Sequence, residues 1–91
     1  MTSVLDGLRQ KIQKIDVELV DLLRQRMNIV LKIGQVKAEQ GFPMQDNKRE
    51  KEVISNVLKL PHDPIPSKDL LALFQHIIDI CLDAQQKSYV K

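Results

Sequence analysis

The sequence has few of the residues on which disulfide-linked, all-β and aromatic-rich proteins depend. Its single cysteine, Cys81, excludes an intramolecular disulfide and is typical of a reducing, cytoplasmic setting. Three glycines and four prolines are too few for the many tight turns of an all-β protein. Tryptophan is absent, and two phenylalanines and one tyrosine are the only aromatic residues, so the core must be aliphatic. No apolar run approaches the roughly 18 residues of a membrane span, so we expect no membrane association.

The composition that is present is that of one small globular domain. The chain has 91 residues, of which 43% are hydrophobic and 29% charged, which is too apolar for a disordered protein. The net charge of +2 is too small to indicate a nucleic-acid partner. The scarcity of aromatic residues also argues against a protein that stacks on single-stranded bases. We therefore expect a cytoplasmic, mostly helical protein that binds no nucleic acid.

Two breaks divide the chain into three segments with apolar residues at helical spacing. The first break contains Gly41 and Pro43, and the second, over residues 61–66, contains three prolines. The pattern predicts a single all-α domain over residues 1–91 with three helices, long, short and medium. The predicted helices cover about 3–40, 46–60 and 67–88.

Individual residues mark the ends of these helices. Gly41 suits the position just past a helix C-terminus, and Pro43 prevents the helix from resuming. Asp46 and Ser67 are suitable N-caps for the second and third helices. Gly34 lies inside the long helix, where glycine costs about 1 kcal/mol relative to alanine. We expect it to mark a close helix approach or proximity to a ligand.

The long helix is too long for the domain that carries it. At 1.5 Å per residue, a helix over 3–40 is about 55 Å long. A compact chain of this size has a radius of gyration near 12 Å and a diameter of about 30 Å. The helix would therefore extend beyond its own domain with its apolar stripe exposed. This stripe consists of apolar residues three or four positions apart: Leu5, Leu8, Ile12, Ile15, Leu19, Leu22, Val30 and Ile33. We expect a second copy of the chain to cover that stripe, in an intertwined antiparallel homodimer.

Two cations occupy the face of the long helix that carries the apolar stripe. Arg26 and Lys37 continue the series of apolar positions and lie about 16 Å and about 20° apart on the helix. One interpretation is that the stripe ends there and both side chains extend to solvent. The other is a cationic pocket for an anionic ligand, because an unpaired buried charge is costly. Gln85 continues the stripe of the third helix in the same way.

A partner helix would bring a third cation to this pocket. Arg9 lies about 26 Å along the helix from Arg26, so the two cannot share one ligand within a chain. If two long helices pair antiparallel with their centre near Val20, Arg9 of one lies level with residue 31 of the other. That level is between Arg26 and Lys37.

The chain resembles the all-α (AroQ-class) chorismate mutases across nearly its whole length. No single stretch carries the resemblance, but the order and spacing of the stretches together are highly specific. The matching stretches are LRQKI at 8–12, LLRQR at 22–26, IGQVK at 33–37, PMQDNKRE at 43–50 and LFQHII at 73–78, with Gln85 downstream.

The resemblance implies an intertwined homodimer with two composite active sites. It implies conversion of chorismate to prephenate, in phenylalanine and tyrosine biosynthesis, without a cofactor or metal. Arg9 from the opposite chain and Arg26 would bind the two carboxylates of the substrate. Lys37 and Gln85 would donate hydrogen bonds to the ether oxygen. As the ether bond breaks, these donors would stabilise the negative charge that grows on that oxygen.

The resemblance also assigns residues at the start of the second helix. Glu50 would accept a hydrogen bond from the ring hydroxyl, and Asp46 would contribute at the same end through its backbone. Arg49 would support a carboxylate. Cys81 departs from the family, which commonly has a small hydroxyl residue there, and a thiol is a poorer donor. We interpret Cys81 as a residue that lines the pocket.

Three other functions remain as alternatives. An isochorismate–pyruvate lyase shares the fold and the basic pocket, although the acidic turn at 46–50 favours the mutase. A mutase-like domain that regulates or accompanies a DAHP synthase is a second alternative. The third is a non-catalytic helical dimerisation module, which has no use for Arg26 and Lys37 on the packing stripe.

Overall fold

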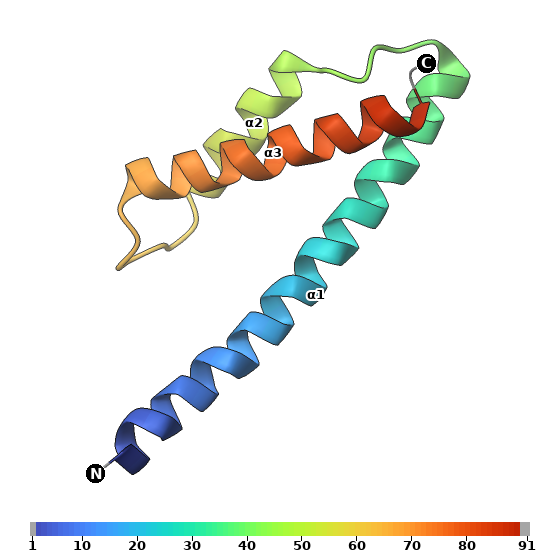
Figure 1. Cartoon of the computed structure of the whole chain (residues 1–91). Coiled ribbons are helices and arrows are strands. Elements are labelled where there is room, and N and C mark those ends of the chain that lie inside the picture. The colour runs from blue at the N-terminus through green and yellow to red at the C-terminus, as the bar shows by residue number, and fades with distance from the viewer. Residues whose placement is uncertain (1, 90–91) are drawn as a thin grey trace.

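The protein is all-helical, as the sequence predicts. The computed structural model describes residues 2–89 and contains three helices, with no strand in that range. The long first helix, α1, is followed by the short α2 and the intermediate α3 (Figure 1). Each predicted helix end lies within two residues of the observed one. The observed bounds are Thr2–Gln40 for α1, Asn47–Leu58 for α2 and Ser67–Tyr89 for α3.

The residues predicted to stop α1 and start α2 do so. Gly41 has a φ of +75°, a left-handed conformation that glycine adopts without strain. The Phe42 amide then donates to the Lys37 carbonyl over 2.9 Å, which closes a Schellman motif at the end of α1. Asp46 is the N-cap of α2, and its side chain accepts from the Arg49 amide over 3.1 Å.

The predicted cap of α3 is wrong by one residue. The carbonyl of Pro66 accepts from the amides of Asp69 and Leu70, both over 3.0 Å, so Pro66 occupies the N-cap position. Ser67 is the first helical residue. Its hydroxyl lies 2.9 Å from Nε2 of His62, in the loop before the helix. The serine therefore fixes the loop to the helix start instead of capping the free amides.

The third helix is the centre of the packing. It contacts both other helices, while α1 and α2 make no close backbone approach to each other. In Figure 1, α2 lies beside α3 and runs in the opposite direction, and both lie at the C-terminal end of α1. Among the residues whose burial is described, few apolar side chains are buried, and most of these belong to α3: Met44, Leu70, Ile78 and Cys81. Within residues 2–89, no helix combines the length and the apolar character of a membrane span.

The N-terminal half of α1 projects away from the rest of the chain. The molecule measures 60 × 24 × 16 Å and has a radius of gyration of 16.9 Å, well above the roughly 12 Å of a compact chain of this size. Figure 1 shows no other helix beside this half of α1. Its apolar stripe is accordingly exposed, with Leu8 at 54%, Ile12 at 59% and Ile15 at 56%. The predicted overhang is thus present in the single chain.

Candidate active site

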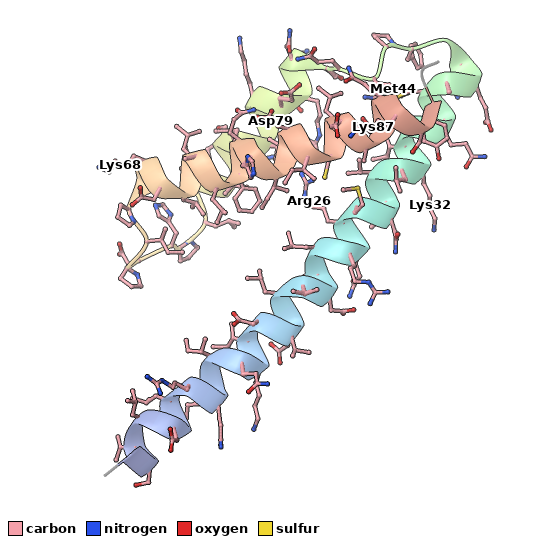
Figure 2. The ribbon with its side chains drawn as sticks, viewed as in Figure 1. Arg26, Lys32, Met44, Lys68, Asp79 and Lys87 are labelled. Atoms are coloured by element: carbon pink, nitrogen blue, oxygen red, sulfur yellow. The ribbon has the colours of Figure 1, made fainter. Side chains whose placement is uncertain are left out.

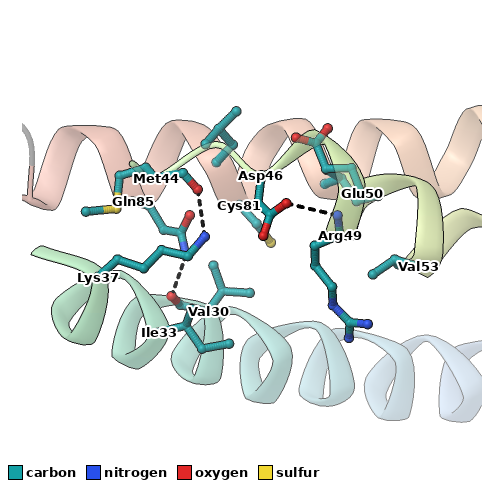
Figure 3. A pocket seen from close by; sticks show the side chains of 12 residues that line it. Val30, Ile33, Lys37, Met44, Asp46, Arg49, Glu50, Val53, Cys81 and Gln85 are labelled. Carbon is teal, nitrogen blue, oxygen red and sulfur yellow. Dashed lines mark hydrogen bonds between the residues drawn. The ribbon is translucent and has the colours of Figure 1, made fainter. Parts of the chain in front are cut away.

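A pocket lies where the C-terminal half of α1, the start of α2 and the C-terminal half of α3 meet (Figure 3). Its cavity volume is about 140 Å³. Pockets for small organic ligands commonly measure about 300–1,000 Å³, so one chain encloses only part of such a site. Six of the eight predicted site residues line the pocket: Lys37, Asp46, Arg49, Glu50, Cys81 and Gln85. The other two are Arg9 and Arg26.

Lys37 extends from α1 across the pocket to the segment before α2. Its Nζ donates to the carbonyl oxygen of Met44 over 2.8 Å, and Met44 itself is buried. A lysine ammonium has three protons, so this bond holds the side chain in place and leaves donors for a ligand. The cation on the apolar stripe therefore points into the pocket.

Gln85 reaches the same pocket from α3. It is the one buried polar residue among those described, with 6% of its surface exposed. Its Nε2 donates to the carbonyl oxygen of Val30 on α1 over 2.8 Å, which leaves the second amide proton free to donate. Figure 3 shows the side chains of Lys37 and Gln85 next to each other. Two donors from helices far apart in sequence thus share one region.

Arg26 lies beside this pocket and not in its lining. One guanidinium nitrogen, Nη1, donates to Sγ of the buried Cys81 over 3.2 Å. Cys81 borders the pocket and also a second, apolar cavity of similar volume, which Arg26 lines as well. Figure 2 shows Arg26 between α1 and α3, whereas the exposed Lys32 projects outward from α1. Cys81 therefore contacts an arginine that the sequence assigned to ligand binding.

The start of α2 supplies both signs of charge. Asp46, Arg49 and Glu50 all line the pocket, and Glu50 is partly buried. Arg49 pairs with Glu52 over 3.4 Å, but both side chains are more than half exposed, so this pair adds little stability. The lining residues of one chain together carry two cations and two carboxylates. Arg26 nearby makes the local balance positive.

Arg9 is far from this pocket in its own chain. It lies on the exposed N-terminal half of α1, about 26 Å along the helix from Arg26. The chain by itself does not bring Arg9 to the other predicted site residues. In the expected antiparallel pair, Arg9 of one chain would lie level with residue 31 of the other. Residue 31 lies between Val30 and Ile33, which both line the pocket.

The sequence did not identify the backbone groups that hold the donors. The carbonyls of Val30 and Met44 accept from Gln85 and Lys37, and any residue can provide a carbonyl, so no side-chain pattern reveals them. Within residues 2–89, no group of three or more His, Cys, Asp or Glu side chains is arranged to hold a metal ion.

Comparisons with known proteins give consistent matches. The profile of the family described as chorismate mutase type II matches residues 8–86. A bifunctional chorismate mutase/prephenate dehydratase of Aquifex aeolicus is 30% identical over 87 residues, which is 91% of this chain. The chain spans only 24% of the length of that relative.

Solved structures match along nearly their whole length. A chorismate mutase from Thermus thermophilus (form II) aligns with a TM-score of 0.87 and 29% identity, over 90% of this chain and 93% of that one. A chorismate mutase from Helicobacter pylori, in complex with prephenate, aligns with a TM-score of 0.85 and 30% identity, over 93% and 92%.

Proposed function

Because this chain belongs to the chorismate mutase type II family, we propose that it converts chorismate into prephenate for phenylalanine and tyrosine biosynthesis. The reaction breaks the ether C–O bond of chorismate while a C–C bond forms in the same molecule, so no external group is consumed. The observation that carries the proposal is the meeting of Lys37 and Gln85, donors on two helices, in one pocket. The Helicobacter pylori relative binds prephenate, the product of this reaction.

The proposed active unit is an intertwined antiparallel homodimer. One chain leaves the stripe of α1 exposed and encloses only part of a ligand pocket. Pairing near Val20 covers the stripe and brings Arg9 of the partner subunit to the level of Val30 and Ile33. Each active site is then built from both chains.

The charges of such a composite site match those of chorismate. The pocket lining of one chain is neutral in sum, with two cations and two carboxylates. Arg26 and Arg9 of the partner subunit add two positive charges, which balance the two carboxylates of the substrate. Arginine binds carboxylates through paired, charge-assisted hydrogen bonds. Holding both carboxylates fixes the folded, reactive conformer and removes much of the entropic barrier.

Lys37 and Gln85 act on the ether oxygen. Negative charge grows there as the C–O bond breaks, and both side chains keep free protons beyond the bonds that hold them. A donor aimed at developing charge typically lowers the activation barrier by about 3–4 kcal/mol. Because an amide donates without being protonated, Gln85 imposes no acidic pH optimum.

The start of α2 orients the other end of the substrate. Glu50 lines the pocket and accepts the hydrogen bond of the ring hydroxyl. Asp46 contributes through its backbone, and its side chain is already used to cap α2. Arg49 supports a carboxylate once the substrate replaces its weak contact with Glu52. The buried Cys81 is a free thiol, which fits a reducing cytoplasm.

Chorismate consumption by the purified protein tests this function. We expect loss of the ultraviolet absorbance of chorismate, and no salicylate from isochorismate, which would be the product of a lyase. Lys37→Ala should lower kcat by at least about 100-fold because one transition-state donor is lost. Lys32→Ala removes an exposed lysine of the same helix and should leave kcat unchanged. Full activity in Lys37→Ala would contradict the mechanism.

Mixing two inactive variants tests the composite site. Arg9→Ala and Arg26→Ala chains are each expected to be strongly impaired, because each lacks one carboxylate ligand per site. A mixed dimer contains one site with both defects and one intact site. Subunit exchange should therefore restore activity, up to half of the wild-type value per mixed dimer. Exchange without recovery would contradict a site shared between chains.

A further inference from the structure

Gly34, on the buried face of α1, lies against two side chains of α3. A methyl group built on Gly34 would lie 2.8 Å from Cδ2 and 3.0 Å from Cε2 of Tyr89, closer than ordinary van der Waals contact. The same methyl group would lie 3.1 Å from Cγ of Gln85. The edge of the tyrosine ring and the stem of Gln85 therefore occupy the space that a larger residue at position 34 would need.

Tyr89 and Gln85 are neighbours on α3. Residues four apart in a helix lie one above the other on the same face. Gln85 has three rotatable bonds, and its pocket function depends on the one conformation in which Nε2 reaches the Val30 carbonyl, 2.8 Å away. Since Gly34 has no side chain, the ring of Tyr89 and the stem of Gln85 both occupy the space beside it.

We infer that Tyr89 is a positioning residue, which holds Gln85 in its donating conformation by packing its ring on Gly34. This inference rests on the proposed function, in which Gln85 donates to the ether oxygen. Tyr89 does not line the pocket, so it acts through Gln85 and not on the substrate. The contact is made by ring carbons, so the ring and not the hydroxyl is required.

Steady-state kinetics with chorismate test the role of Tyr89. Tyr89→Ala should lower kcat about tenfold and change KM by less than about twofold. The reason is that a misplaced Gln85 weakens a hydrogen bond that stabilises the transition state and not the bound substrate. Tyr89→Phe should keep the wild-type kcat because it keeps the ring. Ser88→Ala, a change at the exposed neighbouring position of α3, is the matched control and should also keep it.

A double-mutant cycle separates positioning from a general structural effect. If Tyr89 acts through Gln85, Tyr89→Ala should not lower kcat further in a Gln85→Ala background. A tenfold loss in both backgrounds, a loss confined to KM, or a Tyr89→Phe variant as poor as Tyr89→Ala would each overturn the inference. A wild-type protein that does not consume chorismate would instead overturn the proposed function, and the inference with it.

Fluorescence tests the packing without reference to activity. Tyr89 is the only tyrosine and the chain has no tryptophan, so tyrosine emission reports this side chain alone. We expect Gly34→Ala to displace the ring and to increase quenching by acrylamide, whereas Gly7→Ala, with no atom nearby, should not. Equal quenching in both variants and the wild type would show that the ring does not rest on Gly34, and would overturn the inference.

Discussion

Leu19→Ala should weaken the proposed dimer much more than a change on the opposite side of the same helix. Leu19 belongs to the apolar stripe of α1 and is 51% exposed in the single chain. Antiparallel pairing centred near Val20 puts Leu19 level with residue 21 of the other chain, close to the two-fold axis. Because both copies carry the substitution, the interface loses two leucines near its centre.

The size of the effect follows from this exposure. Burying a whole leucine side chain contributes about 1.5–3 kcal/mol. About half of Leu19 is already shielded within the chain, so pairing gains about half of that value per copy. Two copies together give about 1.5–3 kcal/mol per dimer. The dissociation constant should rise about 10- to 150-fold.

Sedimentation equilibrium over a range of protein concentrations measures this constant. Val17→Ala is the matched control, because Val17 is 66% exposed and lies about 200° around the helix from Leu19. We expect its dimer to be as stable as that of the wild type. Activity of Leu19→Ala should also fall on dilution, as Arg9 of the partner subunit is lost. A monomeric wild type, or equal dissociation constants for both variants, would refute the reasoning.

The remaining predictions concern contacts within one chain. Cys81→Ser should keep KM for chorismate within about threefold of the wild-type value, because a hydroxyl oxygen also accepts a hydrogen bond from Arg26. Cys81→Ala leaves the Arg26 guanidinium without this partner and should raise KM more. Equal KM values for the two variants would refute this. Gly34→Ala should lower the melting temperature by about 2–8 °C in calorimetry, because overpacking against the tyrosine ring outweighs the gain in helix propensity; a higher melting temperature would count against the close contact. The hydrogen bond and charge of Asp83 raise the pKa of Lys87 above its usual 10.5. The pair's contribution to stability is therefore complete below pH 10.5 and is lost as the pH rises through the folded-state pKa. An NMR titration should show the raised pKa in the wild type and its return to the usual value in Asp83→Asn, and identical values would contradict the interaction.

The helices were predictable because local signals agree with the packing. Gly41 stops α1 in a left-handed conformation that other residues avoid, and Asp46 caps α2 with a side chain suited to that task. The N-cap of α3 was mispredicted because the Ser67 hydroxyl can either cap the helix or bond to a side chain in the preceding loop. In the structure, the hydroxyl of Ser67 bonds to His62 in that loop, and no local sequence pattern distinguishes such a contact from a cap.

The sequence could predict which residues belong to the candidate site, but not the contacts that hold their side chains. Lys37 and Gln85 stand out because each places a polar group on an apolar stripe, and the structure brings both to one pocket. What holds them is a matter of tertiary packing. The same limit applies to Gly34, whose helix penalty indicates a close approach but does not identify Tyr89 as the neighbour.

The two halves of α1 have different sources of stability. Val30, Ile33 and Lys37, in the C-terminal half, line the pocket beside α3. Within residues 2–89, no other helix lies beside the half that carries Arg9. Helices in proteins gain most of their stability from tertiary packing of an apolar face, so in the proposed dimer the N-terminal half would be stabilised as a helix by the partner. The same proposed pairing would bring Arg9 to the other chain's pocket. In the proposed dimer, helix formation in that half, dimerisation and completion of the active site would therefore be coupled. This coupling would let a chain with so small a core hold a dianion between rigid donors.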